Sequence, residues 1–175
     1  LVVLGFIRHD LDRSLSTYWK GYAWKEKPAF RLIDGKLEPM TAENRPSAIN
    51  RFIAGHSRLV GVWRRVARSL NRHWAVGYRW KLNRAIFEAI RDDCRSAGIP
   101  LVVVHIPINR RTPLPMLARE FADMGIKFLD LNPLLPPDAD RLYYPRDRHL
   151  TADGHRFTAG AIHRFLEKEG LDRAK

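Results

Sequence analysis

The stretch LVVVHI at residues 101–106 decides the fold class. It is a short apolar run rich in β-branched residues, and a turn signal, Gly98 with Pro100, comes just before it. Runs of this kind are typical of parallel strands that are covered on both faces of a sheet. The same pattern occurs at residues 1–7, LVVLGFI, and more briefly at 127–131, KFLDL, so we expect three parallel strands.

Helical patterns lie between and after these strands. In the clearest of them, Leu82, Ile86 and Ile90 recur at the spacing of one helix face. The alternation of strands and helices indicates an α/β fold with a parallel sheet. Residues 28–40 predict a hairpin, because Asp34-Gly35 is a two-residue turn signal between two short runs with apolar residues. The predicted helices cover residues 47–72, 80–97 and 114–124, and Gly98 is expected to cap the second of them in a left-handed conformation. The last helix runs from Thr151 as N-cap through Glu169.

Composition excludes several classes of protein. The 175 residues fit one domain, and a hydrophobic content of 45% argues against a disordered tail. No run approaches the roughly 20 apolar residues that a membrane-spanning helix needs. One cysteine, Cys94, excludes an internal disulfide framework and a cysteine-rich zinc site. Since no HExxH pattern occurs and His149 and His155 are six residues apart, we expect no metal site and no cofactor.

The net charge of +12 is concentrated in one segment. Residues 44–87 contain ten Lys or Arg and no Asp or Glu, and all five Trp lie within residues 19–80. One explanation is an amphipathic helical cap with Trp inside and Arg stems along its rim. Another is a surface for anionic lipid or glycan. A third is nucleic-acid contact, which we rank last because no recognised nucleic-acid motif is present.

The densest polar cluster is YPRDRHLTADGH at residues 144–155. Asp147 and His149 are two residues apart on a predicted loop, and in an extended chain such residues point the same way. The carboxylate of Asp147 could then accept a hydrogen bond from Nδ1 of His149 and leave Nε2 free as a general base for a serine hydroxyl. The alternative is an ordinary helix start with a surface histidine, and the spacing alone leaves both open.

The wider pattern resembles a known family, the SGNH or GDSL-type hydrolases. YYPRDRHLTADGHRFTAGAI at residues 143–162 resembles the last motif block of that family. LVVLGFIRHDLDRS at 1–14 resembles the third block, in which a buried strand delivers an Asn-Asp pair to the site. AGIPLVVVHIPI at 97–108 is similar to the strand between these blocks, and PAFRLIDGKL at 28–37 is similar to an excursion of many bacterial members. The resemblance covers nearly the whole chain and is weakest at 41–80.

This resemblance implies a flavodoxin-like three-layer α/β/α sandwich with a parallel sheet and a Ser-His-Asp ester hydrolase or O-acyltransferase. His149 would be the general base and then the acid toward the leaving alcohol, and Asp147 would orient the imidazole. His9 stands at the position of the third-block Asn, which contributes to the oxyanion hole, and Asp10 would brace the loop. For His9 a strand-end histidine held by a neighbour, and for Asp10 a solvated carboxylate, remain alternatives. We interpret His105, inside a strand, as a packed core histidine.

Three departures from the family pattern matter. The nucleophile block Gly-Asp-Ser and the second block with its oxyanion Gly are absent, and Ser57 is only a weak look-alike. We expect both blocks to precede Leu1, so that the domain is incomplete, lacks its N-terminal strands, and is inactive as the chain stands. His9 replaces the third-block Asn. The Asp also stands two residues before the His rather than three, where this chain has Arg146.

The substrate that the resemblance implies is a small acyl ester on a sugar, a lipid or another alcohol. An anionic membrane or glycan surface is a further expected partner, through the basic segment 44–87. The compartment stays open, with the periplasm and secretion among the options, because any signal would lie upstream of Leu1. The rival hypothesis is a non-catalytic binding module that engages anionic lipid or polymer through this segment.

Overall fold

The computed structural model describes residues 1–15, 28–40, 72–108 and 115–172. The chain divides into two compact units, of which the first joins Leu1–Asp10 to Glu88–Lys175 and the second is Leu11–Phe87. The predicted helix at 47–72 and most of the basic segment 44–87 lie outside the described residues. Only residues 72–87 of that segment are described, and they form the first part of a long helix.

A three-stranded parallel sheet organises the first unit. Its strands are β1 (Val2–Phe6), β4 (Leu101–His105) and β5 (Lys127–Asp130), in the order β1-β4-β5. Both pairings are parallel, with Phe6 beside His105 and His105 beside Asp130 in register. The predicted strands and the α/β class are therefore confirmed.

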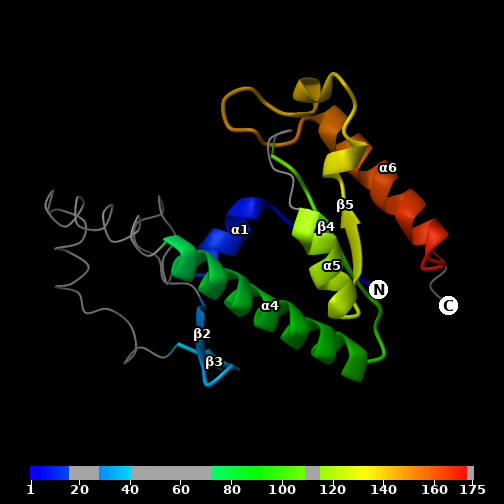
Figure 1. Ribbon diagram of the computed structural model, residues 1–175. Coiled ribbons are helices and arrows are strands. Elements are labelled where there is room, and N and C mark those ends of the chain that lie inside the picture. The colour runs from blue at the N-terminus through cyan, green and yellow to red at the C-terminus, as the bar shows by residue number, and fades with distance from the viewer. Residues whose placement is uncertain (16–27, 41–71, 109–114, 173–175) are drawn as a thin grey trace, which may run out of the picture. The chain divides into compact units, whose positions relative to one another are not determined.

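The helices α5 (Pro115–Asp123) and α6 (Ala152–Lys168) pack on opposite faces of this sheet (Figure 1). Side chains alternate along a strand, so neighbouring residues of β5 face opposite ways. Leu129 packs in a core cluster with Ala161 of α6, whereas the ring of Phe128 stacks on Phe121 of α5 with ring centroids 4.5 Å apart. Short 3₁₀ turns, η2 (Asn132–Leu134) and η3 (Ala139–Leu142), connect β5 to the loop before α6.

In the second unit the predicted hairpin is confirmed. Its strands are β2 (Phe30–Ile33) and β3 (Lys36–Pro39), which pair antiparallel. Asp34 and Gly35 both have positive φ, 49° and 78°, as a two-residue hairpin turn with the twist of the strands requires. The hydroxyl of Tyr78 accepts a hydrogen bond from the backbone N–H of Leu32, which fastens the hairpin to a helix.

That helix is α4 (Arg72–Ser96), which begins eight residues before the predicted start at 80. Tyr78 lies in these added turns, and its bond to the hairpin is a tertiary contact that helix periodicity does not register. The C-terminal end agrees with the prediction, because Gly98 adopts φ of 66° just past it. No helix among the described residues is long and apolar enough to cross a membrane.

The expectation that β1 is covered on both faces is wrong. Val3 is 40% exposed, although its register partner Val102 on β4 is fully buried. The exposed residues alternate along β1 with Val2, Leu4 and Phe6, of which Phe6 is buried, so one face of this edge strand is covered less than the other. An apolar sequence identifies a strand but not the number of neighbours that cover it.

Candidate functional site

A short closed loop carries Asp147 and His149. It begins after η3 and ends at the first residue of α6, and Tyr143 and Leu150 form an antiparallel bridge across its base. Backbone bonds from the N–H of Tyr144 to the carbonyl of His149 (2.8 Å) and from Arg148 to Tyr144 (3.0 Å) close it further. The loop is therefore held by its own backbone while its tip remains exposed.

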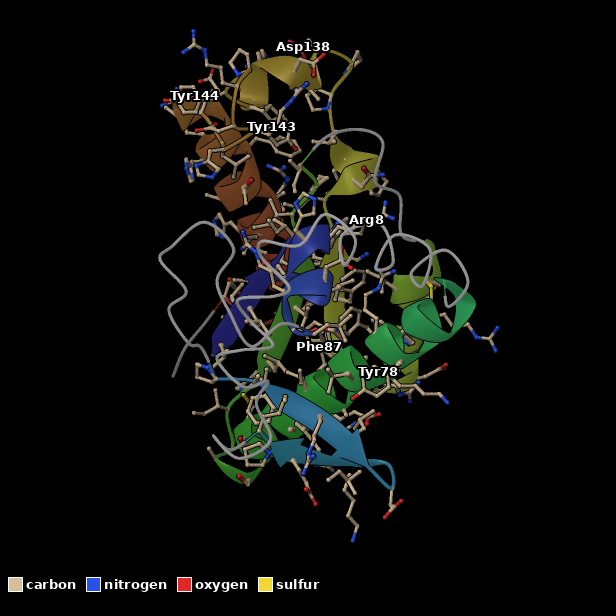
Figure 2. All side chains as sticks on the ribbon, turned by 90° about the vertical axis from the view of Figure 1, so that its left-hand side faces the viewer. Arg8, Tyr78, Phe87, Asp138, Tyr143 and Tyr144 are labelled. Atoms are coloured by element: carbon tan, nitrogen blue, oxygen red, sulfur yellow. The ribbon has the colours of Figure 1, made fainter. Side chains whose placement is uncertain are left out.

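Tyr143 fastens this loop to the strand β4. Its hydroxyl donates a 2.6 Å hydrogen bond to the carbonyl of Pro107, two residues past the end of β4. Burial raises the pKa of the Tyr143 phenol above its ordinary value. Tyr143 is 5% exposed and Tyr144 53%, and Figure 2 shows the first on the inner side of the loop and the second at its outer rim.

The junction between the loop and α6 is equally constrained. Thr151 is the N-cap, as predicted, and its hydroxyl oxygen accepts the N–H of Gly154 at 3.2 Å while donating to the carbonyl of Arg141 at 3.0 Å. Gly154 is required by space, because a Cβ there would lie 2.2 Å from the carbonyl oxygen of Leu142. The glycine of the quoted block thus lets the helix approach the loop closely.

Asp147 and His149 lie side by side at the tip of the loop. The distance from Oδ2 of Asp147 to Nδ1 of His149 is 3.8 Å, which is longer than a hydrogen bond. Oδ1 of Asp147 instead accepts the backbone N–H of His149 at 3.0 Å. The side chains of His149 and Asp147 are 83% and 60% exposed, so the imidazole is open to an incoming molecule.

The predicted reason for this proximity was wrong. The stretch is not extended, because Arg148 between the two residues has φ of 60°, in the left-handed region. A carboxylate that accepts the N–H two residues on is the ordinary way in which Asp stabilises a turn. The turn brings the side chains of Asp147 and His149 together without aligning the carboxylate with Nδ1.

His9 and Asp10 lie in α1 (Arg8–Arg13), just past β1. Oδ2 of Asp10 accepts the N–H of Ile7 at 3.0 Å, and the N–H of Asp10 bonds to the carbonyl of Ile7 at 2.9 Å. This reciprocal pair caps the helix start, so Asp10 braces the segment after β1. His9 is exposed, and among the described residues no hydrogen bond or ion pair joins it to Asp147 or His149.

Two serines are described, and neither is arranged as a nucleophile. The hydroxyl of Ser14 donates to the carbonyl of Leu11 at 2.9 Å, and that of Ser96 donates to the carbonyl of Asp93 at 2.8 Å. Each hydroxyl is thus occupied by the backbone three residues before it. Ser57 lies outside the described residues, as do the other three serines, Ser16, Ser47 and Ser69.

No family model, no curated protein and no solved structure matches this chain. The resemblance to the SGNH hydrolases therefore depends on the quoted residues alone. Within the part of the chain that the structure describes, no group of three or more His, Cys, Asp or Glu is placed to hold a metal ion.

The structure contains a second pair of carboxylate and imidazole that the sequence reasoning missed. His105 is fully buried, as a core histidine should be, but its Nδ1 lies 2.8 Å from Oδ1 of Asp130. The two residues are the last of β4 and β5 and stand in register. A signal was available, since each of two apolar runs that are predicted as parallel strands has a polar residue near its end.

Proposed function

We propose that this chain supplies the general base of an ester hydrolase or O-acyltransferase of SGNH type. His149 is the base and Asp147 is its orienting partner. The supporting observation is the loop itself, on which an open imidazole lies beside a carboxylate while Tyr143, Thr151 and Gly154 hold the loop to the sheet and to α6. A site that is rigid at its base and open at its tip suits acid–base catalysis.

In the proposed reaction Nε2 of His149 takes the proton of a serine hydroxyl as that oxygen attacks the acyl carbonyl. The same nitrogen then returns the proton to the leaving alcohol. The carboxylate of Asp147 stabilises the imidazolium that forms between these steps, and the 3.8 Å separation must shorten when the charge develops. His9 would donate toward the oxyanion and Asp10 would hold the start of α1, as it does in the helix cap.

We further propose that the fold is a flavodoxin-like three-layer sandwich. Its support is a parallel sheet with helices on both faces and the polar loop near the carboxyl ends of the strands, where open α/β sheets place their ligands. The substrate class is a small acyl ester on a sugar, a lipid or another alcohol.

The test compares two exposed histidines in the full-length protein. His163 on α6 matches His149, since it too is exposed and lies 3.6 Å from a carboxylate, that of Glu167. On a short-chain acyl ester, His149→Ala should lower kcat/KM by roughly 10²- to 10⁴-fold. His163→Ala should leave it unchanged. Equal activity in the two variants would show that His149 is not the base.

A second candidate function follows from the ten cations and absent acids of residues 44–87. Such a segment could attach the protein to anionic lipid or polymer. Binding to vesicles that contain anionic lipid should then fall steeply with added salt and be unaffected by His149→Ala. Binding that salt does not change would exclude an electrostatic role.

A further inference from the structure

Two buried acceptor groups lie at the carboxyl ends of β4 and β5. Nε2 of His105 and Oδ1 of Asn132 are inaccessible to solvent, and neither has a hydrogen-bond partner within the described residues. Buried polar atoms are paired in the great majority of native structures, so each unpaired one needs an explanation. Here there are two, and the residues that carry them are joined through Asp130.

The proton positions on His105 follow from its partner. Nδ1 faces the carboxylate of Asp130, which can only accept, so Nδ1 must carry the hydrogen. In the neutral ring Nε2 then has a lone pair and accepts. One described neighbour of the imidazole offers no donor, since the ring of Phe6 lies with its centroid 5.3 Å from that of His105.

Asn132 belongs to the same network. Its backbone N–H donates to the same Oδ1 of Asp130 that His105 contacts, at 2.9 Å, and the N–H of Leu131 donates to the carbonyl of His105 at 3.1 Å. The segment after β5 is thereby fixed against the end of β4. The two unpaired acceptors thus belong to residues that both bond to Oδ1 of Asp130, at the corner where the ends of β4 and β5 meet.

We propose that one water molecule binds at this corner and donates one hydrogen to Nε2 of His105 and the other to Oδ1 of Asn132. Water fits because it has two hydrogens on one small atom, whereas an alcohol has only one and would leave an acceptor unpaired. The water completes a network of Asp130, His105 and Asn132 that ties the ends of the two strands. This site is independent of the proposed esterase activity.

A double-mutant cycle tests the sharing of one water. His105→Asn keeps an amide donor near Asp130 but removes Nε2, and Asn132→Ala removes Oδ1. Each change alone should raise the unfolding equilibrium constant by roughly 5- to 30-fold. The fold-change in the unfolding equilibrium constant of the double variant should be well below the product of the two single fold-changes, because the water is already lost with the first change. Additive effects would overturn the proposal.

The control pairs Asn132→Ala with Leu166→Ala, which removes a side chain from the core on the α6 face and should combine additively.

A measurement on the unaltered protein does not depend on how the variants fold. A high-resolution crystal structure should show an ordered water within hydrogen-bond distance of both acceptors, and histidine ¹⁵N NMR should show a protonated Nδ1 and a bare Nε2. A dry corner, or a protonated Nε2, would overturn the proposal.

Discussion

At Gly154 the loop and α6 approach so closely that no side chain fits between them. A Cβ would lie 2.2 Å from the carbonyl oxygen of Leu142, a backbone atom that cannot move without opening the loop, and 3.0 Å from Cδ2 of Leu150. Gly154→Ala should therefore lower the free energy of unfolding by about 1–3 kcal/mol. Denaturant unfolding measures this change.

The matched control is Gly160→Ala in the same helix. There the nearest atom to the new Cβ is the far end of the Arg164 side chain at 3.3 Å, which can rotate away. Removing a helix-interior glycine should stabilise the protein by up to about 1 kcal/mol. If Gly154→Ala stabilised the protein as Gly160→Ala does, the close approach would be wrong.

Tyr143 gives a prediction about alkaline stability. Burial raises the pKa of its phenol in the folded protein, so above about pH 10 the unfolded chain releases this proton more readily than the folded one. The free energy of unfolding should be unaffected by this group below that pH and fall as the pH rises through it. Tyr143→Phe should cost about 1–3 kcal/mol at neutral pH, through the lost bond to Pro107, and should flatten the alkaline decline. If the free energy of unfolding of Tyr143→Phe declines as steeply at alkaline pH as that of the unaltered protein, other groups cause the decline.

Single residues were predictable where the cause is local. Thr151 as N-cap and Gly98 past α4 follow from rules that act over four residues, and both are confirmed. The pair of His105 and Asp130 was missed because its partners are 25 residues apart in sequence and meet only through strand register. The orientation of Asp147 was missed because the left-handed φ of Arg148 is not evident from its residue type.

At the scale of elements, the sheet offers a matched pair of valines. Val3 of β1 and Val102 of β4 are register partners of the same type, but only Val102 is fully buried. Val102→Thr should destabilise the protein by about 1–3 kcal/mol, because the hydroxyl enters an apolar core. Val3→Thr should change stability by less than about 0.5 kcal/mol, since its hydroxyl can reach water. Equal losses would mean that β1 is covered as fully as β4.

The elements themselves were predictable to a large extent. The strands β4 and β5, the hairpin at Asp34-Gly35 and the helices α5 and α6 occur where apolar periodicity and turn residues indicate. The early start of α4 and the exposure of β1 were not predictable, because both depend on which other segment lies against them. Tertiary contact decides those features and overrides local preference.

Across the whole molecule, the concentrated positive charge of residues 44–87 lies within one of the two compact units. The acid-free segment ends at Phe87, which is also the last residue of the second unit, and the first unit contains Asp147 and His149. The proposed chemistry and the proposed anionic contact therefore belong to different units. Composition indicated the concentrated charge, but it contained no information about which residues share a compact unit.

The most direct test of the central claim is the rate at which a fluorophosphonate labels the full-length protein. This reagent forms a covalent adduct with a serine that a neighbouring base has activated. Mass spectrometry should find one labelled serine, other than Ser14 and Ser96, whose hydroxyls bond to backbone carbonyls. Labelling should be roughly 10²- to 10⁴-fold slower in His149→Ala and unchanged in His163→Ala. Labelling at equal rates in both variants, or no labelled serine in the unaltered protein, would contradict the assignment of His149 as the base.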